Sequence, residues 1–273
     1  MVALVLKHEN YFSADAAREY MSASLYKSFL DCEARAMAGL AGTYCPEPTQ
    51  ALLVGGYADA HFSGEMELFR EQHPEICTRS GGLRAEYQQA DEIIARIERD
   101  PLAMMMLDGE RQKIVTGEMN GVLFRGKLDV LLGARQCEAV AQAYPAMDEL
   151  LFASGAIVDL KIVRDFEPLY KAEEGRQGFI TYWRYDLQMA IYQRLVGGSL
   201  PCYILAATKE KVPDIGLFLL PQSLLDAAME IYLSGLKRVA AVWKELAEPE
   251  RCEKCDHCKQ TKVLTCGVCE EYW

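Results

Sequence analysis

The sequence of 273 residues has no apolar run that reaches the roughly 18–20 residues of a membrane-spanning helix. Its first residues, 1–7, carry no basic lead and are too few for the core of a signal peptide. We therefore expect a cytoplasmic protein with no membrane partner. With 51% hydrophobic and 25% charged residues, the composition also excludes a disordered or a collagen-like chain.

Basic residues are in short supply. The chain has 29 Lys and Arg against 40 Asp and Glu, so its formal net charge at pH 7 is −11. This deficit argues against a general basic surface for nucleic acid. Any binding of DNA has to come from a local patch, or from metal ions that bridge acidic side chains to phosphates.

Cysteine, in contrast, is abundant and unevenly placed. Five of the ten cysteines fall between Cys252 and Cys269. Thiols stay reduced in the cytoplasm, and cysteines clustered in a reducing compartment indicate a metal site rather than disulfides. The end of the chain is therefore expected to hold a metal.

Hydrophobic periodicity predicts an α/β (α+β) fold in which helices come first, a mixed sheet lies in the middle and helices follow. Asn120-Gly121 is a strong signal for a two-residue hairpin turn between two of the strands. We expect one domain over residues 1–249, with a small Cys-rich metal-binding segment, residues 250–273, packed on it. Helices are predicted at 22–40, 50–72, 84–99, near 147–152, at 182–196 and at 221–246, and strands at 113–119, 122–132, 156–163, 202–207 and 215–220.

Two carboxylates and one lysine are predicted to meet on neighbouring strands. Asp159 and Lys161 point to the same face because side chains alternate along a strand, and Asp129 lies on the preceding strand. Two nearby carboxylates repel each other unless a cation lies between them, and a hard divalent ion such as Mg²⁺ prefers oxygen ligands. A lysine beside the ion could orient or deprotonate a water and offset charge on a phosphate. The pattern is typical of metal-assisted phosphodiester hydrolysis.

These residues resemble the core of the PD-(D/E)XK nuclease superfamily. Gln188-Met-Ala-Ile-Tyr192 is similar to the Q-x-x-x-Y motif of its RecB-like branch. Residues 55–61 resemble the helix that supplies a histidine ligand in RecB and RecE nucleases. The likeness runs from about residue 21 to residue 192 and points to the exodeoxyribonuclease 8 family, the RecE-like exonucleases of phages and prophages. It implies a restriction-endonuclease-like core.

The resemblance implies a set of metal ligands. His61, Asp129 and Asp159 would bind a catalytic Mg²⁺ or Mn²⁺, with the carbonyl of Leu160 as a further ligand. Glu118, one strand earlier, would serve a second metal or its water shell. Each residue taken alone has an ordinary structural explanation, and it is their order along the chain that carries the resemblance.

The resemblance also implies the catalytic residues. Lys161 would be the catalytic lysine, and Gln188 and Tyr192 would shape the active site and contact the DNA backbone. The sequence departs from the superfamily pattern at two positions, with Leu128 in place of Pro and Asp159 in place of the commoner Glu. RecE-like and RecB-like members also use Asp there, which favours that branch.

The cysteine-rich segment leaves its metal open. Two C-x-x-C pairs suit tetrahedral Zn²⁺. In the iron–sulfur nucleases of the same superfamily, such as AddB, one cysteine of the first helix and three after the nuclease core hold a [4Fe-4S] cluster, although their last ligand follows a wider gap than here. Such a cluster would tie the two ends of the chain together across a loop of some 220 residues; a tail without metal is the third interpretation. The zinc site would consist of Cys252, Cys255, Cys266 and Cys269, and the iron–sulfur site of Cys32, Cys252, Cys255 and Cys258.

Basic side chains interleaved with aromatic ones follow the catalytic strand. Together they could form a surface for phosphates and stacked bases. Acidic neighbours such as Asp165 and Glu167 are equally compatible with a mixed, solvated loop. The candidate DNA-binding residues are Arg164, Lys171, Arg176 and Arg184.

The resemblance implies a Mg²⁺-dependent DNA exonuclease that hydrolyses linear duplex DNA from its ends in phage or prophage recombination. A single-strand annealing protein is the partner that this role implies, and an oligomer is compatible with it. Two alternatives stay open. One is a structure- or sequence-specific DNA endonuclease, and the other is a catalytically inactive nucleic-acid-binding subunit. The presence of His61, Asp129, Asp159 and Lys161 together argues against the inactive subunit.

Overall fold

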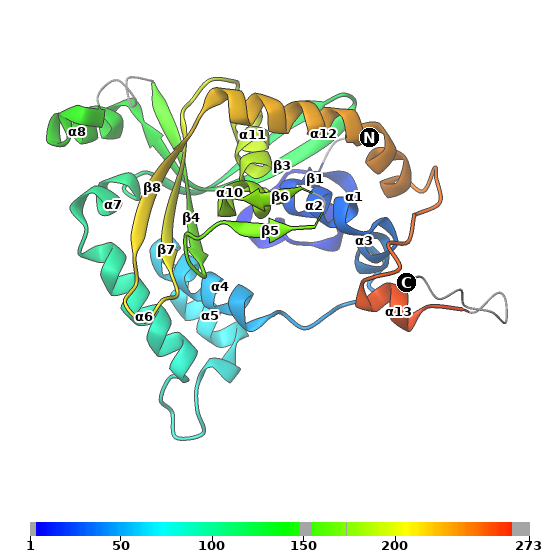
Figure 1. Cartoon of the computed structure of the whole chain (residues 1–273), viewed down its shortest axis with the longest axis horizontal. Helices are drawn as coiled ribbons and strands as arrows, with labels where there is room; N and C mark the ends of the chain where they lie inside the picture. Colours follow the sequence, from blue (N-terminus) through cyan, green and yellow to red (C-terminus); the bar gives the residue numbers. More distant parts are fainter. Residues whose placement is uncertain (1–3, 148–153, 173, 264–273) are drawn as a thin grey trace.

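A six-stranded mixed sheet lies at the centre of the computed structural model (Figure 1), which describes residues 4–147, 154–172 and 174–263. The strand order is β1-β3-β4-β7-β8, with β2 paired to β3. Helices cover the sheet, so the α/β (α+β) class predicted from the sequence is confirmed. The strands are β1 (Met21–Ser22), β2 (Glu110–Met119), β3 (Val122–Gly133), β4 (Gly155–Val163), β7 (Cys202–Thr208) and β8 (Ile215–Leu220).

Each face of the sheet has its own hydrophobic core. Because side chains alternate along a strand, Ile157 packs into one core and its neighbour Val158 into the other. The same alternation separates Ile204 from Leu205 on β7. The first core is built with α2 (Ala23–Asp31), α11 (Tyr185–Leu195) and α12 (Gln222–Trp243), and the second with α4 (Gln50–Ser63), α6 (Ala85–Glu98), α7 (Pro101–Met106) and α8 (Ala134–Ala143).

Two of the predicted helices are each divided in two. The predicted helix 22–40 breaks at Cys32, whose extended backbone ends α2 and whose thiol caps α3 (Glu33–Leu40). The predicted helix 50–72 breaks at Gly64, which takes the left-handed conformation that favours glycine and separates α4 from α5 (Met66–Gln72). Sequence periodicity continues across both breaks, so it does not reveal them.

The remaining elements connect these layers. The predicted Asn120-Gly121 turn is confirmed, with positive φ at both residues. The helix predicted near 147–152 lies outside the described residues except for Met147, and α8 forms before it instead. The other elements are η1 (His8–Asn10), α1 (Ala14–Glu19), η2 (Pro74–Ile76), η3 (Pro145–Met147), β5 (Leu169–Lys171), β6 (Gly175–Gln177), α10 (Phe179–Tyr182) and α13 (Asp256–Gln260).

Strand β3 has a gap along one of its edges. Its other edge pairs with β2 over nearly its whole length. Strand β1 pairs with Phe124 and Arg125, and β4 pairs from Val130 onward, so both must lie on the edge that β2 leaves free. Among the described residues, 126–129 therefore have no strand partner on that edge. The strands β3 and β4 separate here, which opens space for side chains within the sheet.

The chain after α12 returns to the N-terminal helices. Figure 1 shows α13 beside α3, although about 220 residues separate them along the chain. The backbone N–H of Ala34 donates to the carbonyl of Glu250 at 3.0 Å. Within the described part of the chain, no helix is both long and apolar enough to cross a membrane.

Candidate active site and metal centre

Asp129 fills the gap between β3 and β4. Its Oδ2 accepts a hydrogen bond of 2.9 Å from the backbone N–H of Leu160. A side chain thus takes the place of a ladder bond where the two strands part. The bond fixes the carboxylate in the sheet beside the start of the Asp159-Leu160-Lys161 segment.

Asp159 and Lys161 meet as the strand alternation predicts. Their charged groups form an ion pair in which the Asp159 side chain is 1% exposed and that of Lys161 is 19% exposed. Burial alone would lower the pKa of Lys161, but the negative charges of Asp159 and Asp129 outweigh it and raise that pKa. The ammonium therefore stays protonated at neutral pH.

The carboxylates repel one another. Burial and the charge of Asp159 raise the pKa of Asp129 well above its usual value, and Lys161 offsets only part of this effect. The charge of Asp59 raises it further. A buried group of like charges requires a cation, and carboxylate oxygens are ligands that Mg²⁺ and Mn²⁺ accept. The donor set therefore fits a hard divalent ion.

Asp59, which was not among the predicted site residues, approaches from α4. Its Oδ1 accepts a hydrogen bond of 3.1 Å from Gln112, and it lines a cavity of about 10 Å³ with Asp129 and Leu160. This is close to the smallest space that holds one water. Burial raises the pKa of Asp59 above its usual value. The positive charges of Lys161 and Lys127 offset part of this rise, and the negative charge of Asp159 adds to it.

His61 points elsewhere. Two positions along a helix differ by about 200° in direction, so His61 and Asp59 lie on opposite sides of α4. The Nε2 of His61 is 2.8 Å from Oε1 of Glu98 on α6, at a half-exposed position. The structure thus brings Asp59, rather than His61, to the carboxylates. Asp59 belongs to the same Gly-rich helix motif as His61, so the sequence offers both residues but does not decide between them.

Helix α11 brings Gln188 and Tyr192 to the site. The Nε2 of Gln188 donates to Oδ1 of Asp159 at 2.9 Å and to the Tyr192 hydroxyl at 3.4 Å. Tyr192 packs on β3 at Gly126, where a Cβ atom would lie only 2.9 Å from its ring. A glycine at this position therefore permits α11 to approach the gap in the sheet.

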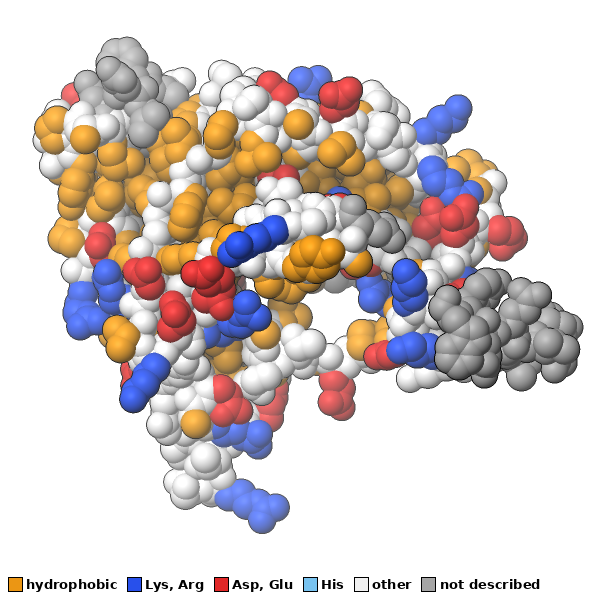
Figure 2. Space-filling model, in the orientation of Figure 1, with side chains coloured by type: hydrophobic (Ala, Val, Ile, Leu, Met, Phe, Trp, Pro, Cys, Tyr) orange, Lys and Arg blue, Asp and Glu red, His pale blue; other side chains and the backbone are white. Residues whose placement is uncertain are grey.

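Other predicted site residues lie apart from the carboxylates. Glu118 is exposed near the hairpin turn, opposite Leu123, which is six residues along β3 from Asp129 and so roughly 20 Å away. Three of the candidate DNA-binding side chains form ion pairs, and Figure 2 shows acidic and basic groups side by side on this face rather than one basic patch. The pairs are Arg164 with Asp165, Lys171 with Glu174, and Arg176 with Glu167, whereas Arg184 precedes α11.

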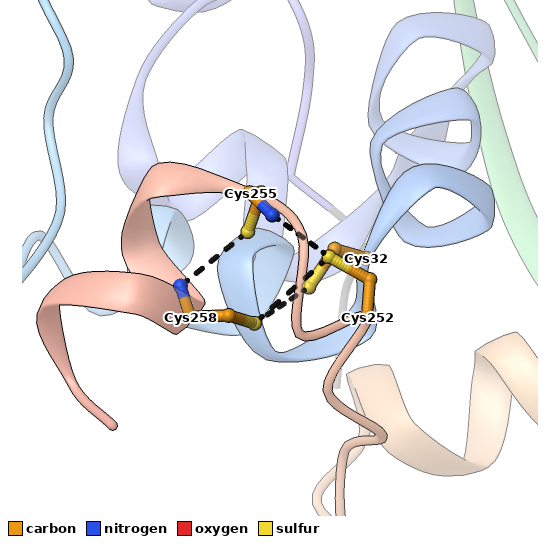
Figure 3. A group of neighbouring side chains, drawn as sticks. All are labelled: Cys32, Cys252, Cys255 and Cys258. Atoms are coloured by element: carbon orange, nitrogen blue, oxygen red, sulfur yellow. Dashed lines mark hydrogen bonds between the residues drawn. The ribbon is translucent and has the colours of Figure 1, made fainter. Parts of the chain in front are cut away.

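Four cysteines from the two ends of the chain converge on one point (Figure 3). Their sulfur atoms all lie within 4.8 Å of one another, and two pairs are separated by 3.6 and 4.0 Å. The cluster joins the α2–α3 junction to the segment that contains α13. It consists of Cys32, Cys252, Cys255 and Cys258, the set predicted for an iron–sulfur site, whereas Cys266 and Cys269 of the alternative zinc set lie outside the described residues.

Backbone N–H groups donate to three of the four cysteine sulfur atoms. Sγ of Cys32 accepts the N–H of Arg35 at the start of α3, and Sγ of Cys252 and of Cys255 each accept the N–H three residues later. Backbone donation from Lys254 and Cys255 lowers the pKa of Cys252 to about 6, whereas burial raises that of Cys255 to about 11. Thiolate sulfur is the form that binds metal. The cluster therefore fits a thiolate metal centre.

Comparisons with known proteins agree with this architecture. A family model described as a PDDEXK-like domain of unknown function (DUF3799) matches residues 22–138 and 144–261. The crystal structure of a protein described as a "Putative exonuclease" from Eubacterium rectale is similar, with a TM-score of 0.86 and 36% sequence identity over 97% of both chains. No curated protein matches the sequence.

Proposed function

Because this chain belongs to the family of PDDEXK-like domains, and hence to the PD-(D/E)XK nuclease superfamily, we propose that it is a divalent-metal-dependent exonuclease of linear duplex DNA. The observation that carries the proposal is the meeting of Asp129, Asp159 and Lys161 where β3 and β4 separate. A buried ion pair beside a second carboxylate is a costly arrangement in a protein interior. It is the arrangement that metal-assisted phosphodiester hydrolysis needs.

We propose Asp59, Asp129 and Asp159 as the ligands of Mg²⁺ or Mn²⁺, with the carbonyl of Leu160 as a further ligand. When bound, the ion supplies positive charge that stabilises the negative charge developing on the phosphate. We propose that Asp59 takes the role that the sequence resemblance assigned to His61. Asp59 is close enough to the other two carboxylates for its charge to raise the pKa of Asp129 and for the charge of Asp159 to raise its own. Three carboxylates and Lys161 leave a net negative site, which a divalent cation neutralises.

The protein's own side chains would stabilise the charge on the phosphate and position the metal ligands. In the metal-free protein Asp129 and Asp159 hold Lys161 protonated, and we propose that its ammonium acts as a fixed cation toward a phosphate oxygen. Gln188 donates to Asp159 and so fixes the direction of that carboxylate. Tyr192 packs against the strand behind it.

We further propose that DNA is bound locally, at the β5–β6 hairpin that follows β4. Its basic side chains are paired with carboxylates in the free protein, so a phosphate has to replace a carboxylate at each contact. Because the whole chain carries a net charge of −11, binding should weaken steeply as salt is added. The divalent ion should strengthen it.

The test of the function compares DNA forms. Purified protein is incubated with linear duplex and with covalently closed circular duplex of the same sequence, in Mg²⁺, in Mn²⁺ and in a chelator. Loss of the linear form alone supports the exonuclease. Nicking of the circle would support an endonuclease instead, and no digestion in either metal would support a binding subunit and overturn the proposal.

Matched variants show whether this site is responsible. Asp159→Asn and Lys161→Met should abolish cleavage while thermal melting confirms a folded protein. Asp226→Asn removes an exposed carboxylate on α12, and Lys113→Met an exposed lysine on β2. These controls should cleave normally. Full activity in either site variant would remove the assignment.

For the four cysteines we propose a structural metal centre. The resemblance to iron–sulfur nucleases favours a [4Fe-4S] cluster, in which each thiolate binds its own iron atom. The close sulfur atoms favour a single tetrahedral Zn²⁺, whose thiolates lie about 3.8 Å apart. Anaerobic purification, metal analysis and the visible absorption spectrum decide between them. Stoichiometric absence of both metals would overturn the proposal.

A role in phage or prophage recombination, with a single-strand annealing protein as partner, follows from the resemblance to RecE-like exonucleases. Such a nuclease must digest one strand of the duplex and leave the other intact. End-labelled DNA, with the label on either strand, tests this requirement. Degradation of both strands at equal rates would argue against that role.

A further inference from the structure

Lys27 on α2 lies beside the candidate active site, although it is not among the predicted site residues. Its Nζ is 3.4 Å from Oε1 of Gln188 and 3.4 Å from the backbone carbonyl of Arg184. Both acceptors belong to α11 or to the residue that precedes it. The lysine therefore links α2 to α11, the helix that carries the Q-x-x-x-Y motif.

The position is an unfavourable one for a second ammonium group. Lys27 lies 5.6 Å from the centre of the Tyr185 ring, and Lys161 lies 5.3 Å from the centre of the same ring. Burial and the charge of Lys161 lower the pKa of Lys27 to about 8, against a partial offset from Asp159. A partly buried cation next to another cation lowers stability unless a specific interaction compensates for it.

The Gln188 amide supplies that interaction, because its two ends are used differently. A lysine ammonium can only donate hydrogen bonds, and an ionised carboxylate can only accept them. Lys27 therefore requires the amide oxygen, and Asp159 requires the amide nitrogen, which donates to it at 2.9 Å. Both neighbours select the same orientation. The reversed amide would place its oxygen against the Asp159 carboxylate.

We propose that Lys27 is a positioning residue for the nuclease site: it holds the Gln188 amide in the orientation that donates to Asp159. The proposal rests on the proposed function, because Asp159 has to be a metal ligand for its direction to matter. Residues that orient a ligand from behind affect metal affinity and turnover by about 10–100-fold. Lys27 reaches Asp159 through Gln188, not directly.

The experiment replaces Lys27 by methionine, which keeps the unbranched stem and removes the donor. Mn²⁺ affinity is measured by calorimetry on protein whose cysteine centre is intact, with Asp159→Asn as the blank. We expect affinity about 10-fold weaker or worse, and kcat lower by a similar factor. At saturating Mn²⁺, the KM for DNA should change by less than about threefold, since the lysine contacts the amide rather than the substrate.

Lys209→Met is the matched control. Lys209 is also partly buried, its pKa is also lowered by burial, and its Nζ donates to the carbonyl of Ala51 at 3.1 Å, away from the carboxylates. This variant should keep wild-type Mn²⁺ affinity. If the methionine variant of Lys27 does not fold, Lys27→Gln replaces it. The glutamine side chain is too short to make the same contact, so the expected losses are the same.

A double-mutant comparison separates positioning from direct contact with DNA. If Lys27 acts through Gln188, Lys27→Met combined with Gln188→Leu loses no more Mn²⁺ affinity than Gln188→Leu alone. Multiplied losses, unchanged Mn²⁺ affinity in Lys27→Met, or a raised KM without a fall in kcat would overturn the role of Lys27. A wild-type protein that neither binds Mn²⁺ at Asp159 nor cleaves DNA would overturn the proposed function itself.

Discussion

The carboxylate site and the cysteine centre are built in opposite ways. The carboxylates Asp129 and Asp159 lie on neighbouring strands with a hydrophobic core on each face of the sheet. The cysteines join two segments from opposite ends of the chain, and among the described residues their hydrophobic cluster contains Ala34 besides the cysteines themselves. One site is held by the fold, whereas the other has to hold part of the fold itself.

This difference gives the two metals opposite structural roles. The sheet forces the carboxylates together, so their repulsion lowers stability until a cation binds, and a raised pKa of Asp129 is the expression of that cost. The cysteine segment has little packing of its own, so a metal there would supply much of its order. Removal of metal should leave the first site in place and release the second.

The largest effect is expected from Asp129→Asn. The variant keeps the shape of the side chain and can still accept the hydrogen bond from Leu160 N–H, but it removes one of the repelling charges. Cleavage should fall by at least about 100-fold, since a metal ligand is lost. The thermal midpoint without metal should stay the same or rise. Cleavage rate and melting are measured on the same preparation.

A marked fall in the thermal midpoint of Asp129→Asn would contradict the idea that repulsion between the carboxylates destabilises the metal-free protein. Leu128→Ala, in the neighbouring core position of β3, provides the contrast. It should lower the unfolding free energy by about 2–5 kcal/mol because it leaves a cavity. The two substitutions thus separate a residue kept for function from a residue kept for packing.

Much of this architecture can be predicted from the sequence. The Asn120-Gly121 turn fixes the β2–β3 hairpin, and strand alternation places Asp159 and Lys161 on one face. Cysteines clustered near the end of the chain indicate a metal centre by themselves, whereas the choice of Cys32 as a fourth ligand comes from the resemblance to iron–sulfur nucleases, and these four cysteines do converge. These signals are local or depend on residue type, so the amino-acid sequence shows them directly.

The choice between Asp59 and His61 cannot be predicted in the same way. Both belong to one helix, and which of them faces the carboxylates depends on how α4 rotates against α6 and the sheet. That rotation is set by tertiary packing, with Tyr57 buried against Tyr87 of α6. The break at Cys32 is similar, because its thiol caps α3 only in the folded chain.

The next largest effect is expected from Cys32→Ser. Cys32 is the member of the cluster that comes from the N-terminal part of the chain. Without it the metal should be lost, and the two ends of the chain should no longer be linked. Closing a loop of about 220 residues stabilises a protein by about 3–5 kcal/mol, and the unfolding free energy should fall by that amount. Chemical denaturation with metal analysis measures it.

Cys137→Ser is the control for this experiment, because Cys137 is a buried cysteine on α8 that packs in the second core of the sheet, away from the cysteine cluster. It should keep the metal. Cleavage by Cys32→Ser should fall much less than by Asp129→Asn, since the sheet still assembles the carboxylates. A complete loss of cleavage in folded Cys32→Ser would show that the two sites are not independent.

A smaller effect is expected in the pH dependence of stability at the carboxylate site. In metal-free protein, burial and neighbouring charges raise the pKa of Asp129 above its value in the unfolded chain, so its cost grows as the pH rises above that unfolded value and is full above the raised pKa. The cost is relieved as the pH falls through the raised pKa toward about 4. Thermal stability of the chelator-treated wild type should therefore rise between pH 7.5 and 5.5 relative to Asp129→Asn. Parallel profiles would contradict this assignment.

The smallest effect is expected from Arg238→Ala. Arg238 on α12 bonds both carboxylate oxygens of Glu33 at 3.0 and 2.6 Å and the carbonyl of Glu248 at 2.8 Å, so it helps to hold the returning chain. The pair is exposed and screened by salt, and a bound metal should hide its loss. Limited proteolysis of the tail should therefore speed up in metal-free Arg238→Ala, but not in the metal-bound form. Arg35→Ala, which removes an exposed pair with Asp31, is the control. Equal acceleration with and without metal would mean that the ion pair, and not the cysteine centre, holds the tail.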